Sequence, residues 1–413
     1  MVRASKIVAA LSIPNIPFRV FCLIGVSLLP ADWTVASVFV RVAPSSHLRG
    51  YLDSDYSFFL SSIVKLLKRR LGSAGRPFGN PLNGSSDEQT WFAKMSVWPH
   101  RRGRLWFQAV KLLLIDGHYY VYRSFFAIPN LSNSGGEPTN AIFGFTKTLR
   151  LMLKHLQPEL GAVFWDEGIP ERRVKLQPAY KETRKEMPKP MVPQLDFIQE
   201  TLTPPLGFKN ISLPNTEADD LMGCYAIAAC KRAGMQVVLA TNDKDLYQLV
   251  GPCVKVYTTA KADLPSPKDA FALLGEQEVT AKWDVPPKLI GDVLALSGDT
   301  VDNIPGVGLG RKTAAALIRE FGGLEQLLAN VDKVKSPRTR EKLANAREQV
   351  LQNRKMVDLD CHLDLPMAID DLRIKPDYPN LIAALEKCEF KSLLQEVREE
   401  AARAGAVAQG ALL

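Results

Sequence analysis

Beyond the first quarter of the chain, short apolar runs alternate with segments of helical spacing. Three of the apolar runs end in an aspartate, at Asp116, Asp166 and Asp243. Between them, residues 141–156 and 218–231 place apolar side chains three or four positions apart, which predicts amphipathic helices. Strands that alternate with helices are typical of a parallel α/β sheet, in which ligands bind at the carboxyl ends of the strands. We therefore expect the three aspartates to meet at one edge of such a sheet.

The first 104 residues lack a sustained apolar period and are rich in basic side chains. They hold 14 lysines and arginines against 5 acids, and Ser, Gly, Pro and Asn fill residues 72–86. An acid-poor, arginine-containing start of this kind predicts an organelle transit peptide followed by a disordered linker. The organelle would be a plastid or a mitochondrion, in preference to the cytosol or the nucleus. A misassigned start codon, a disordered tail and, less favoured, a secretory signal are the alternatives.

The composition is that of an ordinary globular protein, with 413 residues of which 46% are hydrophobic and 23% charged. The net charge of +8 arises in the first 104 residues, so the remainder, at −1, offers no global argument for nucleic-acid binding. Six cysteines occur without a Cys-x-x-Cys pair, which argues against a zinc ribbon or a disulfide framework and favours a reducing compartment. The apolar run over residues 20–29 is too short to span a bilayer, so no membrane association is expected.

A cluster of acids, Glu217-Ala-Asp-Asp220, stands at the start of the second predicted helix. Its carboxylates repel one another, and a nearby cation would relieve that repulsion. The alternative is structural, because acids in the first turn of a helix, behind an N-cap at Thr216, are stabilised by the helix dipole. The cluster is therefore a candidate metal site.

Two more pairs of acids, Asp243-Lys-Asp245 and Asp299-Thr-Val-Asp302, follow apolar segments, and either pair alone would be a solvated turn. Together the acids form an all-oxygen set, which hard divalent ions prefer, and Mg²⁺ is typically held by a few carboxylates and substrate phosphates. This set predicts two-metal hydrolysis of a phosphate ester without a covalent intermediate. The predicted metal ligands are Asp116, Asp166, Glu217, Asp219, Asp220, Asp243, Asp245, Asp299 and Asp302.

A glycine-rich segment, Pro305-Gly-Val-Gly-Leu-Gly310, leads into a predicted helix over residues 313–321. Glycines allow backbone N–H groups to approach an anion at a helix N-terminus, where basic side chains add charge. The pattern is typical of a helix-hairpin-helix that grips a DNA backbone, although a glycine-rich turn without a ligand is the alternative. Its spacing does not match a nucleotide P-loop. The predicted DNA contacts are Gly306, Gly308, Gly310, Arg311, Lys312 and Thr313.

Basic side chains and a tyrosine fill residues 171–185, between Asp166 and Glu217. A flexible cationic element beside a metal site would steer a phosphodiester and stack a base on the tyrosine, whereas a solvated charged helix is the alternative. An additional phosphate contact is expected from Arg123. The predicted DNA-binding residues of this segment are Arg172, Lys175, Tyr180, Lys181 and Arg184.

From about Leu112 to Leu394 the chain closely resembles the 5′-nuclease domain of bacterial DNA polymerase I, within the flap endonuclease superfamily. The resemblance implies an α/β fold, with a PIN-like parallel-sheet domain and a helical arch, followed by an α-helical helix-hairpin-helix region. All nine acids match the family's metal ligands, and Asp116, Lys181 and Arg184 are the expected catalytic residues. The matching motifs are Ile115-Asp-Gly, Tyr122-Arg-Ser-Phe-Phe-Ala, Gly136-Glu-Pro-Thr-Asn-Ala, Tyr180-Lys, Glu217-Ala-Asp-Asp, Asn242-Asp-Lys-Asp-Leu-Tyr and Gly298-Asp-Thr-Val-Asp-Asn-Ile-Pro-Gly.

The resemblance implies a metal-dependent 5′→3′ DNA exonuclease that is also a structure-specific 5′-flap endonuclease, acting in primer removal, replication and repair. The implied cofactors are two Mg²⁺ ions, with Mn²⁺ as a substitute, and K⁺ at the helix-hairpin-helix. The expected partners are DNA with 5′ flaps, nicks or duplex 5′ ends, together with an organellar DNA polymerase and a ligase. The protein would act as a stand-alone monomer. A catalytically silent DNA-junction-binding protein and a PIN-like ribonuclease are the alternatives.

The predicted organisation has four parts: a transit peptide and linker over residues 1–104, a nuclease domain over 105–275, a helix-hairpin-helix region over 276–350, and a closing segment and tail over 351–413. One feature departs from the family. The glycine hairpin at residues 305–310 is one residue shorter than the usual bacterial form. The cation site and the DNA grip of this hairpin are therefore in question, whereas the carboxylates are separate from it.

Overall fold

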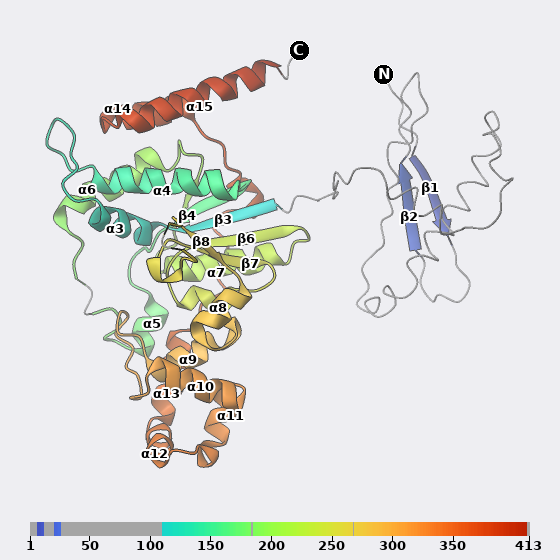
Figure 1. Cartoon of the computed structure of the whole chain (residues 1–413), viewed down its shortest axis with the longest axis vertical. Helices are drawn as coiled ribbons and strands as arrows, with labels where there is room; N and C mark the ends of the chain where they lie inside the picture. The colour runs from blue at the N-terminus through green and yellow to red at the C-terminus, as the bar shows by residue number, and fades with distance from the viewer. Residues whose placement is uncertain (1–5, 12–19, 26–109, 183–184, 267, 411–413) are drawn as a thin grey trace. The chain divides into compact units, whose positions relative to one another are not determined.

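The structure is a computed structural model that describes residues 6–11, 20–25, 110–182, 185–266 and 268–410 (Figure 1). The chain divides into two units, Met1–His100 and Arg101–Leu413. In the first unit, β1 (Lys6–Leu11) pairs antiparallel with β2 (Val20–Gly25). These two strands lie within the segment predicted as a transit peptide and linker. The rest of the predicted transit peptide and linker lies outside the described residues.

A six-stranded sheet forms the centre of the second unit (Figure 1). The strands stand in the order β5-β4-β3-β6-β7-β8, of which the first five are parallel and β8 is antiparallel to β7. This confirms the expected parallel sheet and places the three strands that precede aspartates, β4, β3 and β6, side by side. The strands are β3 (Val110–Asp116), β4 (Leu160–Phe164), β5 (Lys209–Ile211), β6 (Met235–Ala240), β7 (Val254–Thr258) and β8 (Ala272–Leu274).

Helices make up most of the remaining described residues, and none of those described is long and apolar enough to cross a membrane. They are α3 (Gly117–Ala127), α4 (Asn140–Leu156), α5 (Glu171–Leu176), α6 (Val192–Phe197), α7 (Ala218–Cys230), α8 (Glu276–Trp283), α9 (Ile290–Ser297), α10 (Arg311–Phe321), α11 (Leu324–Ala329), α12 (Pro337–Asn345), α13 (Arg347–Met356), α14 (Tyr378–Lys387) and α15 (Lys391–Gly410). Shorter helical turns are η1 (Lys189–Met191), η2 (Ile198–Leu202), η3 (Asp245–Leu249), η4 (Lys261–Asp263), η5 (Pro287–Leu289), η6 (Val331–Lys333) and η7 (Ile369–Leu372).

The four central strands, β4, β3, β6 and β7, divide their side chains between two apolar cores. Leu112 and Leu114 of β3 belong to one core, and Leu113 and Ile115 to the other, as the two-residue period of a strand requires. Helices α3 and α4 supply one core and α7 the other, so both faces of the sheet are covered. All four β3 side chains are consequently buried. This two-sided burial explains why the strands read as continuous apolar runs rather than alternating ones.

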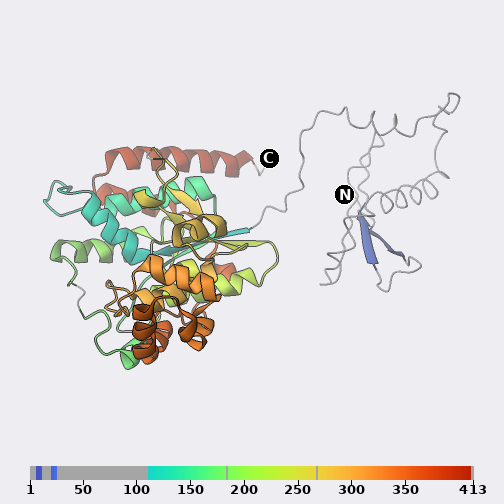
Figure 2. The ribbon, with the colours of Figure 1, turned by 60° about the horizontal axis from the view of Figure 1, so that its bottom comes forward.

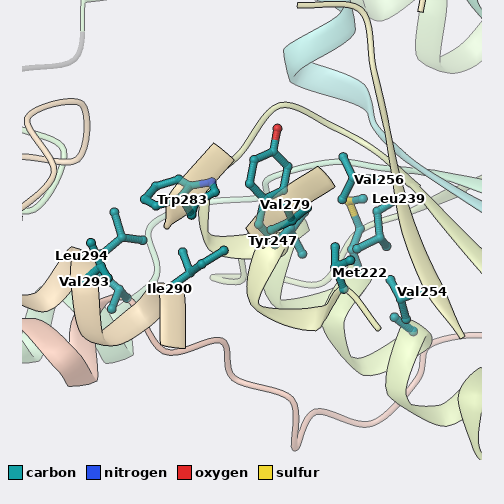
Figure 3. Close-up of a cluster of buried hydrophobic side chains, with 14 of the residues drawn as sticks. Met222, Leu239, Tyr247, Val254, Val256, Val279, Trp283, Ile290, Val293 and Leu294 are labelled. Atoms are coloured by element: carbon teal, nitrogen blue, oxygen red, sulfur yellow. The ribbon is translucent and has the colours of Figure 1, made fainter. Parts of the chain in front are cut away.

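Helices α8 to α13 gather on one side of the sheet, as Figures 1 and 2 show from two directions. Figure 3 shows how they join it: Trp283 of α8 and Ile290 and Val293 of α9 pack in the same core as Tyr247 and Leu239. The core therefore continues across the boundary predicted at residue 275. A shared core of this kind holds the glycine-rich hairpin at a defined place relative to the sheet.

The segment over residues 171–182 is not one continuous helix. Helix α5 ends at Leu176, because the next residue, Gln177, precedes Pro178 and adopts an extended conformation, with φ −146° and ψ 100°. A residue before proline is sterically driven out of the helical region. Turns follow over residues 178–182, and Arg184 lies outside the described residues. The expected helical arch is thus a short helix and a set of turns in this part of the chain.

A disulfide joins Cys230, at the end of α7, to Cys253, just before β7. The expectation that the cysteines would not pair is wrong at this site. The two residues are 23 positions apart in the sequence, and only the packing of α7 against the sheet brings their sulfurs together. Cys224, Cys361 and Cys388 are free thiols.

Reduction of this disulfide is expected to lower the free energy of unfolding by about 3 kcal/mol, because it releases a loop of this length in the unfolded chain. Urea unfolding of the full chain, followed by circular dichroism with and without dithiothreitol, measures the difference. The variant Cys253→Ser should match the reduced protein and be insensitive to dithiothreitol. Equal midpoints for the oxidised and reduced wild type would contradict the prediction.

Candidate active site

Three aspartates meet at the carboxyl edge of the sheet, as expected. Asp116 ends β3 and caps helix α3, where one carboxylate oxygen accepts the Tyr119 N–H at 3.0 Å and the other accepts the Thr241 hydroxyl at 3.0 Å. Burial, together with the negative charges of Asp166 and Asp243, raises the pKa of Asp116 to about 7. The three carboxylates are therefore close enough to influence one another.

Two more carboxylates join this cluster, and both are short of hydrogen-bond partners. Burial raises the pKa of Asp219 well above its usual range, with Asp243 and Asp116 adding repulsion. Burial and the Asp243 charge likewise raise the pKa of Asp245 well above its usual range. One oxygen (Oδ1) of each of these side chains is buried without a hydrogen-bond partner. Buried carboxylate oxygens without donors are costly unless a cation neutralises them.

The loop after α9 adds Asp299 and Asp302, both buried. Their charges contribute to raising the pKa of Asp243, for which burial is the main cause. The Lys244 ammonium donates to one oxygen of Asp299, and the other accepts the Val301 N–H at 2.9 Å. Seven of the nine predicted metal ligands thus gather at one place: Asp116, Asp166, Asp219, Asp243, Asp245, Asp299 and Asp302.

The remaining two acids, Glu217 and Asp220, bind a buried arginine, Arg173. Its guanidinium donates to both oxygens of Asp220, at 2.6 and 2.9 Å, and to one oxygen of Glu217. Asp220 also accepts the backbone N–H of Asp360 at 2.8 Å. Since Glu217 and Asp220 share one face of α7, the cation that relieves their repulsion is Arg173. The structure therefore places Asp220 in an internal ion pair rather than with the other seven carboxylates.

Lys181 links the Arg173 group to the carboxylate cluster. Its ammonium donates to Glu217, and its positive charge lowers the pKa values of Asp219 and Asp243 against the larger effect of burial. The predicted catalytic role of Lys181 is consistent with this place beside the carboxylates. As the side chains stand, no three acidic, histidine or cysteine residues in the described part of the chain are grouped so that they could hold a metal ion.

Tyr180 does not have the predicted role. Its side chain is only 8% exposed, it packs in the core, and its hydroxyl donates to Glu217 at 3.1 Å. A buried ring is not accessible to a nucleic-acid base, so the expectation of base stacking on Tyr180 is wrong. The alternation of basic residues around it suggested a surface, but the sequence carries no signal for the buried acceptor that Tyr180 meets.

The other predicted DNA contacts differ in how exposed they are. Arg172 donates to the backbone carbonyls of Asp358 at 2.9 Å and Lys355 at 3.3 Å, so it holds α5 against the end of α13. Lys175 is exposed and pairs with Glu171 at 2.9 Å. The exposed Arg123 has its guanidinium 3.5 Å from the Thr259 carbonyl.

The glycine hairpin leads into the N-terminus of α10, as predicted. Gly310 precedes the first helical residue, Arg311, and Gly308 has a positive φ of 72°. Arg311 donates to the Lys282 carbonyl at 3.0 Å and lies over the Trp283 ring. Lys312 and Thr313, which follow in the first turn, are both exposed.

Two further residues contribute to the site, although they were not among the residues predicted for it. Arg173 is one, and its only signal was the unexplained repulsion within Glu217-Ala-Asp-Asp220. The other is His118, whose Nδ1 accepts the backbone N–H of Asp166 at 3.2 Å while its ring packs edge-on against Trp165. His118 thereby fixes the main chain at Asp166. Its only signal was its position two residues after Asp116.

Comparisons with known proteins agree with this geometry. The 5′-3′ exonuclease N-terminal resolvase-like domain matches residues 111–284, and the 5′-3′ exonuclease C-terminal SAM fold matches residues 285–380. A 5′-3′ exonuclease of Aquifex aeolicus is 38% identical over 288 residues, which cover 69% of this chain and 94% of the relative. A thermostable DNA polymerase I of Thermus thermophilus is 39% identical over the same length, but there the chain spans 33% of the relative.

A solved structure shares the fold. The bacteriophage T5 flap endonuclease, in a complex with DNA and metal ions, superposes with a TM-score of 0.51 at 19% identity, covering 70% of this chain and 98% of the phage protein. The likeness shows the arrangement of sheet and helices. With the two matched domains and the relative from Aquifex aeolicus, the chain belongs to the 5′-3′ exonuclease family and is a nuclease.

Proposed function

We propose that the protein hydrolyses phosphodiester bonds of DNA with the help of divalent ions, as a 5′→3′ exonuclease and a 5′-flap endonuclease. The observation that carries this proposal is the cluster of seven carboxylates at the sheet edge, in which Asp219 and Asp245 keep buried oxygens without donors. Such a cluster fits a hard cation, because oxygen ligands of this charge are those that Mg²⁺ prefers. The T5 relative's complex with DNA and metal ions supports the same reading.

The cluster contains two groups of carboxylates that would hold the metal. Asp116, Asp166 and Asp219 extend from β3, β4 and α7, whereas Asp243 and Asp245 follow β6 and lie towards the loop after α9. We infer that two Mg²⁺ ions, for which Mn²⁺ would substitute, bind these groups. Bound in this way, the ions supply Lewis-acid activation of a water and of the leaving oxygen.

The protein's own groups pre-orient these ligands. Asp166 accepts the N–H of Ala218, the first residue of α7, at 2.8 Å, so the N-terminal end of that helix stabilises its negative charge. Asp116 is held by Tyr119 and Thr241. The Lys181 and Lys244 ammonium groups neutralise neighbouring acids, and their contacts would be exchanged for metal contacts on loading. Fixed carboxylates of this kind lower the cost of reorganisation during the reaction.

The metal-free protein is expected to lose stability as the pH rises. The pKa of Asp116 is about 7 in the folded protein and near 3.8 when unfolded, so the folded state holds the proton more tightly. The stabilisation is complete at low pH and is lost as the pH rises through about 7, and the raised pKa values of Asp219, Asp243 and Asp245 act in the same direction. Mg²⁺ should reduce this dependence of stability on pH, because the bound ion, rather than bound protons, then neutralises the carboxylates.

Thermal unfolding between pH 5.5 and 8.5, in EDTA and in Mg²⁺, measures this linkage as the shift of Tm with pH. We expect Mg²⁺ to raise Tm most at the alkaline end. A Tm in EDTA that is constant or increases across this range would contradict the assignment.

The cellular setting is a further proposal. We infer primer removal during replication and repair, on 5′ flaps, nicks and duplex 5′ ends, with a DNA polymerase and a ligase as partners of a monomeric enzyme. The acid-poor, basic start of the chain supports import into a plastid or a mitochondrion. Fusion of residues 1–104 to a fluorescent protein tests the import, and a cytosolic or nuclear signal would refute it.

The activity is tested with the full chain on a 5′-flap DNA duplex labelled at each end, in Mg²⁺ and in EDTA, beside the matched RNA flap. We expect metal-dependent cutting at the flap junction and from 5′ ends of DNA. Binding of the flap without cutting in Mg²⁺ or Mn²⁺ would favour a junction-binding protein. Preference for single-stranded RNA would favour a PIN-like ribonuclease.

A further inference from the structure

The backbone carbonyls of the glycine hairpin are already largely occupied. Five of the eight carbonyl oxygens from Asn303 to Gly310 accept hydrogen bonds from groups of the protein. Two of the donors are backbone N–H groups, those of Asp299 to Ile304 O (2.9 Å) and of Ala314 to Gly310 O (3.0 Å). The other donors are side chains: Gln177 to Asn303 O (2.5 Å), Gln349 and Asn353 to Pro305 O (2.9 and 2.7 Å), and Lys342 to Gly308 O (2.5 Å).

Lys342 of α12 is the charged donor in this set. Its ammonium lies 2.5 Å from the Gly308 carbonyl, a short, charge-assisted contact. The glycine at position 308 permits this close approach. Gly308 has a φ of +72°, and a Cβ at this position would lie 2.9 Å from the Lys342 Nζ. Among the described residues, no carboxylate forms an ion pair with Lys342, so its charge remains at the hairpin.

A free K⁺ ion does not fit this hairpin well. Potassium is bound by several carbonyl oxygens that together replace its hydration shell. Here Pro305 O accepts from two side-chain amides and Gly308 O accepts from an ammonium. The carbonyl oxygens on both sides of Gly306 and Val307 therefore already have donors from the protein. The hairpin is also one residue shorter than the usual form, which leaves fewer carbonyls to complete a shell.

We propose that the Lys342 ammonium takes the place of a monovalent cation in this hairpin, closing the turn ahead of α10 and supplying fixed positive charge beside its N-terminus. The proposal rests on the DNA binding proposed above. Free N–H groups at the start of a helix attract an anion. The Lys342 ammonium at Gly308, two residues before the N-cap Gly310, adds to this positive electrostatic potential. DNA affinity should therefore be independent of K⁺ at constant ionic strength, and Lys342 is a positioning residue.

The test measures binding of a 5′-flap duplex to the full chain in EDTA, by fluorescence anisotropy, in KCl, NaCl and tetramethylammonium chloride of equal ionic strength. Wild-type Kd values should agree within about twofold in the three salts. Lys342→Ala should weaken binding about tenfold in tetramethylammonium and recover partly in K⁺, because the emptied space then admits the ion.

Lys333→Ala is the matched control, since Lys333 is an exposed lysine of η6 whose ammonium has no partner among the described residues. Any change in the affinity of Lys333→Ala for the flap should be the same in all three salts. Wild-type binding that is more than about fivefold tighter in K⁺ would overturn the proposal. So would a Lys342→Ala variant that matches Lys333→Ala, or one that is weakened equally in every salt.

A second measurement does not depend on DNA. The wild-type Tm should be the same in K⁺ and in tetramethylammonium, and a Tm raised by K⁺ alone would overturn the proposal even if Lys342→Ala fails to fold. Absence of flap binding by the wild type in every salt would instead refute the proposed DNA-directed function. The two failures are thus distinguishable.

Discussion

Replacing Asp219 by asparagine is expected to reduce cleavage of a 5′-flap duplex on the order of a thousandfold, equivalent to about 4 kcal/mol of transition-state stabilisation. Asp219 is buried within the carboxylate cluster, where the charges of Asp243, Asp116 and Asp166 all act on it. The substitution keeps the shape of the side chain but removes the charge that a metal needs. Single-turnover cleavage in Mg²⁺ measures the loss.

The same substitution should raise the stability of the metal-free protein. An ionised carboxylate at this buried position is repelled by its neighbours, so a neutral amide relieves repulsion at pH 8. Tm in EDTA is therefore expected to increase while activity is lost. Glu167→Gln is the matched control, because Glu167 is exposed beside Asp166 and its carboxylate accepts only from Ser212 among the described residues. Full activity of Asp219→Asn, or a Glu167→Gln variant that is equally inactive, would refute the assignment.

The second large effect is expected on stability. Replacing Arg173 by methionine should destabilise the fold by about 3–5 kcal/mol, because it leaves the buried Asp220 without its cation and Glu217 with Lys181 alone. Urea unfolding at pH 8 measures the loss.

Arg172→Met is the matched control for Arg173→Met, because Arg172 is the neighbouring arginine and donates to carbonyls rather than to buried carboxylates. It should lose much less stability. Adding Asp220→Asn to Arg173→Met should restore part of the loss, which a double-mutant cycle would register as coupling. Equal stability of Arg173→Met and the wild type would show that the arginine does not compensate these acids.

The elements that the sequence predicts correctly depend on features that are local in the chain. Each apolar run before Asp116, Asp166 and Asp243 became a strand, and the three strands became neighbours because parallel α/β connections order them so. The helix over residues 141–156 began one residue earlier, at Asn140, and that over 218–231 ended one residue earlier, at Cys230. These elements depend on periodicity within a short window.

Residues whose surroundings the sequence does not predict have partners that lie far away in the chain. The segment around Tyr180 has the composition of a solvated surface, yet Tyr180 is buried by its contact with Glu217, 37 positions away. Composition does not reveal such a contact, because burial depends on what packs against the segment. Likewise, six scattered cysteines gave no sign that α7 would bring Cys230 to Cys253.

By itself the sequence determined the parallel sheet, its helices, the acidic strand ends and the glycine hairpin, because each follows from spacing, side-chain chemistry or backbone freedom within a few residues. Only the tertiary structure decided which charges neutralise which. Arg173 meets Glu217 across 44 positions, and Lys342 meets Gly308 across 34. Ion pairing and burial are set by distances in space, so the division of nine acids into a cluster of seven carboxylates and an internal salt bridge became visible only in the fold.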